Sequence, residues 1–214
     1  IVLQGVYRST IEDGQYGYHL SILFNLGTDM EQAEGNSTEN YRIIPANAFP
    51  TTQSEVQTTW SSLYAGVYNA NDFLERISSK INTYSDTDRQ LATLYIAEAR
   101  ALRAMFYFEL VRRYGNIALM TNTEMSKQDP RTFVQVKPEN EFIEDDLLYA
   151  SRILPYAQDD QYRIDNSYRF SRGAALGLLS KVYATWAGYP VYDESKWEEA
   201  AKTARTLIES GKHA

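Results

Sequence analysis

The side chains able to perform acid–base chemistry do not form a catalytic set. The two histidines, His19 and His213, lie far apart in the sequence and lack the short spacing of metal ligands. Acidic residues gather at 141–146 and 159–160, and a pair of carboxylates is what glycoside hydrolysis requires. Most of these acids fall on the solvent-exposed side of an amphipathic helix or in a turn, so we favour solvated surface carboxylates over a catalytic pair. With no phosphate loop and no nucleophile elbow, the sequence predicts no catalytic residues, no metal and no cofactor.

Arginines stand among core residues in one segment, residues 95–121, YIAEARALRAMFYFELVRRYGNIALMT. On a helical wheel this segment is apolar nearly all round, which predicts a helix packed on more than one side. Arg100 and Arg103 then lie close to buried surface, where an unpaired charge is very costly. We expect both to be internal struts paired with carboxylates or helix-end carbonyls, with Glu98 as a candidate partner. Gly115 permits the left-handed turn that ends the helix.

Helices must position these side chains, because no strand pattern is convincing apart from NYRII at 40–44 and FVQV at 133–136. The remainder of a first helix occupies residues 1–12. Residues 13–52, rich in Gly, Asn, Thr and Pro, read as a long irregular connection that lies across one face, and such connections are often functional. Apolar periodicity predicts five further helices near 54–80, 88–114, 138–154, 170–188 and 195–210, with Ser54 and Ser195 as N-caps and Gly211 at the C-cap.

The last two expected helices contain small residues that allow close approach, including Gly173, Gly177 and Ala200. Such a pair resembles a tetratricopeptide repeat, in which each helix pair buries the apolar face of its neighbour. The sequence therefore predicts an all-α fold of tetratricopeptide-like antiparallel helix pairs, with a long irregular loop after the first helix, as one domain over residues 1–214.

Composition narrows the function classes. The chain has 214 residues, 43% of them hydrophobic, and a net charge of −7 that argues against nucleic-acid binding. There is no cysteine and no apolar run long enough to span a membrane. Tyrosine, with 17 copies, is enriched, and its ring suits either a helical core or contact with carbohydrate or peptide. The chain starts at Ile1 without Met or signal peptide, so we expect a processed or trimmed sequence.

The segment AEARALRAMFYFELVRRYGNIAL resembles the signature helix of the SusD/RagB family, which reads Glu-Ala-Arg-x-x-Arg-Ala, Tyr-x-x-Leu and Tyr-Gly-x-x-Pro-Leu. Ala118 stands at the proline position. The segment at 131–155 is similar to a second family segment, and residues 171–188 and 197–211 are similar to the two helices that follow. The matching residues are Glu98, Ala99, Arg100, Arg103, Ala104, Tyr107, Leu110, Tyr114, Gly115, Leu119, Ile143, Asp146, Leu147, Ala150 and Leu154.

This resemblance implies a surface-exposed outer-membrane lipoprotein for nutrient uptake. Members bind a glycan, or in some cases a peptide, and hand it unaltered to a SusC-like TonB-dependent transporter. They are about twice this length, so the chain corresponds to their N-terminal helical part. The lipid-bearing cysteine would then lie upstream of Ile1, and the protein would meet the membrane only through that lipid anchor.

In the family, the connection between the first two helices contributes to the binding face. Sugar rings stack their apolar C–H faces on aromatic rings, and their hydroxyls pair with planar polar groups. The connection supplies both kinds, but Tyr41 and Phe49 would equally serve to pin it to the scaffold, and Asp29 to cap a turn. The candidate ligand-binding residues are Asp29, Tyr41, Arg42, Asn47 and Phe49.

Three alternatives remain open: a peptide-binding family member, a generic helical-repeat scaffold for protein interaction, and a glycan-cleaving enzyme. The stacked helix pairs are the expected transporter-facing surface, since repeats offer a broad rigid face. Four aromatic residues near one helix link are either anchors of that interface or core residues, and core is favoured: Trp186, Tyr189, Tyr192 and Trp197.

Overall fold

The structure is a computed structural model that describes residues 2–26, 31, 43–44, 49–50, 52–128, 135–136, 141–163 and 168–212. The chain divides into two compact units, Ile1–Gly66 and Val67–Ala214. The boundary falls within the long helix α2 (Ser54–Ser78), so that the first half of α2 belongs to the first unit and the second half to the second unit.

The first unit consists of α1 (Val2–Thr10), a π-helical turn (Asp13–Gly17), a 3-10 turn (Leu23–Asn25) and the first half of α2. Its core contains Val6 and Leu23, both fully buried. Gly14 is required where the π-helical turn meets α2, because a Cβ on Gly14 would lie 2.8 Å from the Cβ of Ser62. The described start of the long connection is therefore packed directly on α2.

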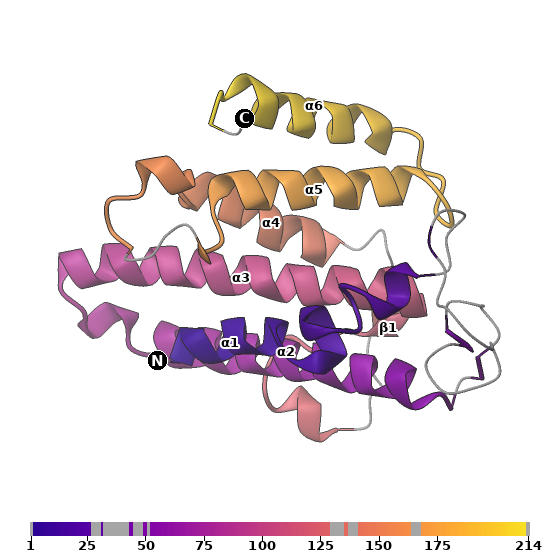
Figure 1. Cartoon of the computed structure of the whole chain (residues 1–214). Helices are drawn as coiled ribbons and strands as arrows, with labels where there is room; N and C mark the ends of the chain where they lie inside the picture. Colours follow the sequence, from indigo (N-terminus) through magenta and orange to yellow (C-terminus); the bar gives the residue numbers. More distant parts are fainter. Residues whose placement is uncertain are drawn as a thin grey trace. The chain divides into compact units, whose positions relative to one another are not determined.

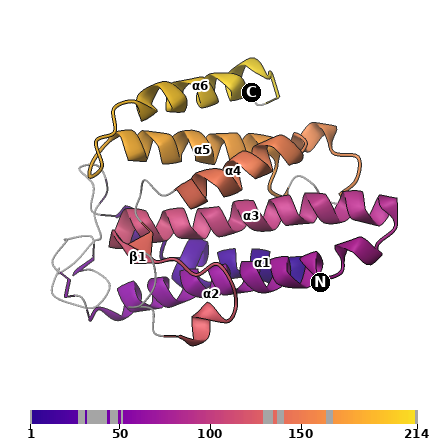
Figure 2. The same ribbon diagram turned by 180° about the vertical axis from the view of Figure 1, so that it is seen from behind.

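The second unit is built around α3 (Asp86–Tyr114), α4 (Glu141–Ile153), α5 (Arg172–Ala187) and α6 (Lys196–Glu209). Each of these helices runs in the opposite direction to the one before it in the chain (Figures 1 and 2). The helix α4 packs against α3 and α5, and α5 packs against α6. Two short strands, β1 (Ile117–Ala118) and β2 (Gln135–Val136), pair antiparallel. The remaining short elements are 3-10 turns at Ile81–Thr83, Met125–Lys127 and Ala157–Asp159.

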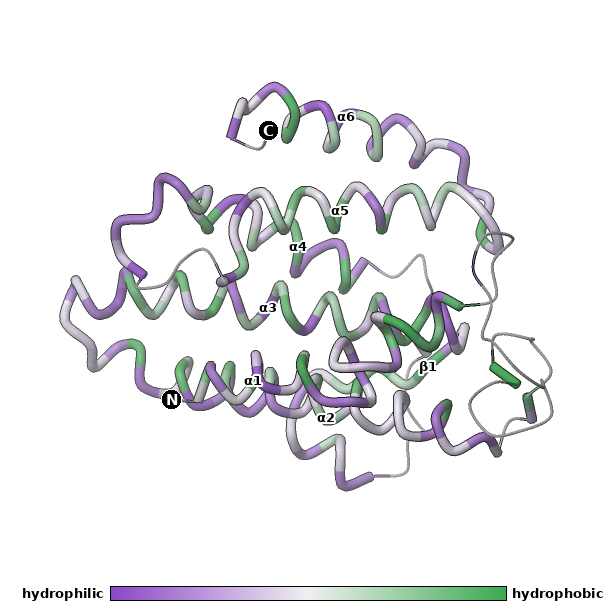
Figure 3. Tube along the Cα trace, viewed as in Figure 1, coloured by the Kyte–Doolittle hydropathy of each residue, from purple (hydrophilic) through white to green (hydrophobic). Residues whose placement is uncertain are grey.

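Small side chains let α3, α4 and α5 approach one another closely. Leu154 and four alanines form one fully buried cluster between these helices. The alanines are Ala97, Ala101, Ala150 and Ala175. In Figure 3, α5 is mostly white to green, whereas α6 alternates purple and green. The helix α5 is accordingly covered on two sides, by α4 and by α6, while α6 keeps one polar face.

The expected all-α class with antiparallel helix pairs is confirmed, and the helix ends differ from the sequence expectation by at most three residues. The helix α3 is buried nearly all round from Ala97 to Val111, and Gly115 follows its last residue with a φ of 73°. Of the two weak strand patterns, FVQV contains β2, whereas Ile43 and Ile44 lie in a turn. The rest of the pattern at 40–44 lies outside the described residues.

The hydroxyls of Ser54 and Ser195 do not form the hydrogen bonds expected of helix N-caps. Ser54 is the first residue of α2, and its Oγ donates to Glu55 Oε2 at 2.9 Å. Ser195 does occupy the N-cap of α6, but its Oγ donates to Asp193 Oδ1 at 2.5 Å. In both places a neighbouring carboxylate accepts the hydroxyl proton. Gly211 stands one residue beyond the C-cap, Ser210, with a φ of 63°.

Candidate functional site

The predicted ligand-binding residues lie mostly outside the described residues. Asp29, Tyr41, Arg42 and Asn47 fall there, so their arrangement stays a prediction. Phe49 is described and is half-buried, immediately before the chain enters α2. The structure therefore characterises how the two ends of the connection are held in the first unit.

The early part of the connection is attached to α2 by buried polar contacts. His19 Nδ1 lies 2.8 Å from Thr59 Oγ1, and Gln15 Nε2 donates to the carbonyl of Ser62 at 2.7 Å. His19 is 7% exposed, and burial lowers its pKa below the usual 6.5, although Glu55 and Asp13 oppose this shift. Thr59 is fully buried, so this contact anchors the connection to α2.

The late part of the connection leads into α2, where the carboxylate of Glu55 lies in the first turn. Glu55 accepts hydrogen bonds from the side chains of Gln53 and Ser54 at the first turn of α2. Burial alone would raise the pKa of Glu55, but the hydrogen bonds from Gln53 and Ser54 and the nearby His19 lower it overall. A carboxylate is favoured at a helix N-terminus. Both ends of the connection thus meet the same stretch of α2.

The arginines of α3 are internal struts, as predicted. Arg103 is 8% exposed and contacts Asp146 of α4 through two nitrogens, at 2.9 and 3.1 Å, while its Nη1 donates to Asn71 of α2 at 2.8 Å. Arg100 Nε donates to the same carboxylate at 2.5 Å. The partner is Asp146 rather than Glu98. Grouping Asp146 with the solvated acids was wrong, because it is 1% exposed.

Glu98 instead joins α3 to the segment between α4 and α5. It accepts two hydrogen bonds from Arg169, both at 3.0 Å, and an ion pair at 2.9 Å from Arg163, whose side chain is fully buried. Arg163 also contacts Asp160 at 2.5 Å. Asp160 was likewise grouped with solvated acids, and its side chain is also fully buried. The residues that carry the family resemblance in α3 therefore hold helices together.

Most of the aromatic group at the link between α5 and α6 is on the surface. Trp186 is 8% exposed and faces Lys196, whose Nζ lies 3.9 Å from the centre of its ring. Tyr189, Tyr192 and Trp197 are 79%, 64% and 52% exposed. Of these four residues, the expectation of a core position is correct for Trp186 only, since the other three side chains are exposed.

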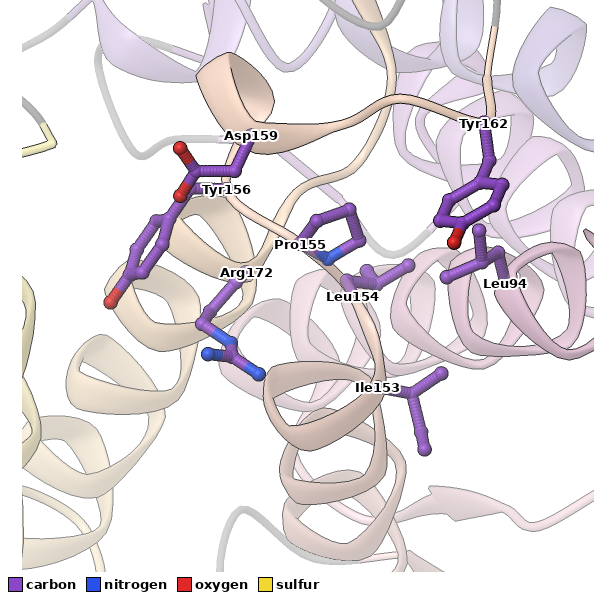
Figure 4. A pocket seen from close by; sticks show the side chains of 8 residues that line it. All are labelled: Leu94, Ile153, Leu154, Pro155, Tyr156, Asp159, Tyr162 and Arg172. Carbon is purple, nitrogen blue, oxygen red and sulfur yellow. The ribbon is translucent and has the colours of Figure 1, made fainter. Parts of the chain in front are cut away.

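A pocket of about 340 Å³ opens in the second unit, where α4 ends (Figure 4). Aliphatic residues of α3 and α4 form part of it, and the segment that leads to α5 supplies tyrosines and charged groups. The lining residues are Leu94, Ile153, Leu154, Pro155, Tyr156, Asp159, Tyr162 and Arg172. Sequence reasoning did not find this pocket, because its members come from three separate segments.

Among the described residues, no group of three or more His, Cys, Asp or Glu side chains is placed to hold a metal ion. Within the same residues, none of the helices combines the length and hydrophobicity needed to cross a membrane.

Comparison with known proteins gives a match over most of the chain. Residues 4–184 match the model of the SusD-like family, which is described as "Starch-binding associating with outer membrane". The chain is 29% identical over 154 residues to a SusD-like protein of Bacteroides ovatus, which covers 71% of this chain and 27% of that protein.

Solved structures share the same arrangement of helices. A SusD homolog from Bacteroides thetaiotaomicron is 72% identical with a TM-score of 0.96, over 100% of this chain and 40% of that one. A structure described as a laminarin-binding SusD-like protein is 27% identical with a TM-score of 0.67, over 86% of this chain and 38% of that one. The chain thus spans less than half the length of these relatives.

Proposed function

Since this chain belongs to the SusD-like family, we propose that it is the helical part of a protein that binds a glycan and delivers it, chemically unaltered, to a transporter. The observation that carries this proposal is the family match over residues 4–184. The family description names starch, and one relative is described as laminarin-binding. A glycan is therefore preferred over a peptide as the ligand.

We place the contribution of this chain to the glycan site on the connection between α1 and α2. Asp29, Tyr41, Arg42, Asn47 and Phe49 offer aromatic rings for stacking and planar polar groups for sugar hydroxyls. The buried contacts of His19 and Gln15 with α2 support this placement, because a loop that is held at its base loses less entropy on binding.

The transporter contact is assigned to the link between α5 and α6. The partner of this proposal is a SusC-like TonB-dependent transporter in the outer membrane, and the protein sits on its outer side, attached by a lipid upstream of Ile1. Tyr189 and Tyr192 are exposed on the link, and Trp197 is exposed in the first turn of α6. Tyrosine and tryptophan are enriched at protein interfaces, where their rings supply contact area.

Two measurements on the intact protein test this function. Isothermal titration against starch and laminarin oligosaccharides and against peptides should give heat of binding with a glycan, and product analysis should find the glycan uncleaved. Affinity purification from solubilised outer membrane should recover a transporter, and the double variant Tyr189→Ala with Tyr192→Ala should reduce that recovery. Binding of peptides alone would favour the peptide-binding alternative. Absence of both ligand and transporter would favour a general interaction scaffold.

A further inference from the structure

We infer that the pocket at the end of α4 is a second carbohydrate site, which takes a single pyranose ring. Its location follows from the structure, while the class of its ligand rests on the proposed glycan function. The volume of about 340 Å³ lies at the small end of the range for ligand pockets. None of the described residues of the connection between α1 and α2 lines it.

The pocket has an apolar side and a polar side, as a sugar ring has. Leu94, Ile153 and Pro155 provide aliphatic surface, and the ring of Tyr162 lies above Leu94 (Figure 4). Leu94 and Ile153 are only partly buried, at the edge of the alanine cluster formed by α3, α4 and α5. This apolar surface suits the C–H face of a pyranose, because burial of such surface is favourable.

The opposite side carries groups for hydroxyls. Arg172 is held in place by a hydrogen bond of 3.0 Å from its Nη2 to the Arg152 carbonyl, and its guanidinium lies 5.6 Å from the centre of the Tyr156 ring. Its Nε is buried and has no hydrogen-bond acceptor among the described residues. An entirely apolar ligand would cover these polar groups without satisfying them, which costs free energy.

A neutral sugar can also use the acidic group of the pocket. The carboxylate of Asp159 is already paired with Lys212, whose Nζ lies 2.8 Å from Oδ1. Asp159 keeps about half of its side chain exposed, so it can still accept a hydrogen bond from a hydroxyl. Arg172 then donates and Asp159 accepts, which matches the dual character of sugar hydroxyls.

The wall that carries Tyr162 is fixed before any ligand arrives. The backbone nitrogens of Tyr162 and Arg163 donate to Asp160 Oδ1 at 3.0 and 3.1 Å. The next side chain, that of Arg163, is fully buried against Glu98 at 2.9 Å. Tyr162 itself is 62% exposed. Its ring is thus available on a rigid backbone, which lowers the entropic cost of binding.

The test is saturation-transfer difference NMR on the intact protein with the methyl glycosides of glucose, galactose, mannose and xylose. We expect at least one glycoside to bind and Tyr162→Ala to weaken it about tenfold, as loss of one stacked ring predicts. Tyr168→Ala is the matched control, because Tyr168 belongs to the same connection between α4 and α5, is 88% exposed and does not line the pocket. It should leave the affinity unchanged.

Variants of the other site separate the two proposals. Tyr41→Ala with Arg42→Ala should weaken oligosaccharide binding to the intact protein but leave the signal that depends on Tyr162. Binding of an oligosaccharide, together with a methyl-glycoside signal that is insensitive to Tyr162→Ala, would overturn the pocket proposal and leave the proposed function standing. Equal effects of Tyr162→Ala and Tyr168→Ala, or no signal from any methyl glycoside, would also overturn it. Melting curves verify that each variant is folded.

Discussion

Arg103 of α3 and Asp146 of α4 form a buried bidentate ion pair, with Nε 2.9 Å from Oδ2 and Nη2 3.1 Å from Oδ1. The same guanidinium donates to Asn71, so one side chain connects α2, α3 and α4. Such pairs give helices a defined register, because a shift along either axis would leave a buried charge without its partner.

Replacement of Arg103 by alanine should therefore lower the free energy of unfolding by about 3–5 kcal/mol, because the buried Asp146 loses its bidentate partner and keeps only the more exposed Arg100. Arg100→Ala should cost less, since the Arg100 side chain is 27% exposed and Arg103 remains on Asp146. Urea denaturation measures both changes. Arg205→Ala, at an exposed position of α6, is the control and should shift stability by less than about 0.5 kcal/mol. Lost glycan binding at unchanged stability would identify Arg103 as a site residue instead.

Two glycines of the second unit should respond to alanine in opposite directions. Gly115 has a φ of 73° and a ψ of −126°, a conformation that other residues avoid, so Gly115→Ala should destabilise the protein by about 1–3 kcal/mol. Gly177 lies within α5, and an added Cβ would meet only Leu207 at an ordinary 3.7 Å. Gly177→Ala should stabilise by about 0.5–1 kcal/mol through helix propensity. Thermal melts of the two variants give the comparison, and equal shifts would contradict it.

The stability of the first unit should fall as the pH drops below about 7. Burial lowers the pKa of His19 from 6.5, so folding favours the neutral imidazole. This contribution is complete above 6.5 and is lost as the pH falls toward the lower pKa of the folded state. The lowered pKa of Glu55 adds a further loss of stability, but only below its ordinary value of 4.5.

His19→Gln should flatten the dependence of melting temperature on pH between about pH 7 and 5, because glutamine can still bond to Thr59 but does not titrate there. His213→Gln, which removes the other histidine, should leave the dependence intact. A flattened profile in the His213 variant instead would refute the assignment to His19.

Removal of the aromatic rings proposed for glycan contact should affect affinity rather than folding. Tyr41→Ala should weaken glycan binding by about 0.5–1.5 kcal/mol in isothermal titration, as loss of one stacked ring predicts. Phe49→Ala distinguishes its two roles, because loss of a ligand contact lowers affinity alone, whereas loss of a pin for the connection lowers the melting temperature as well. Tyr84→Ala, a half-buried tyrosine of the second unit, is the control.

The sequence was sufficient to predict the helices because their signals are local. Apolar residues at helical spacing predict α2 to α6, and Gly115 marks the end of α3. The sequence also predicts that Arg100 and Arg103 are internal struts, because both fall within a helix that is apolar nearly all round. The family followed from several motifs in the same order.

Partner choice and exposure required the tertiary structure. Asp146 follows the helical register of Ile143, Leu147 and Ala150, a signal that it faces the core, but only the packing of α4 on α3 brings it to Arg103. Nothing in the local sequence separates Tyr189 and Tyr192 from a buried tyrosine such as Tyr107, and only the tertiary structure shows that both are exposed. The pocket joins Leu94 to Tyr162 and Arg172 across three segments. Local patterns determine which residues form a helix, whereas contacts between distant segments depend on how the helices pack.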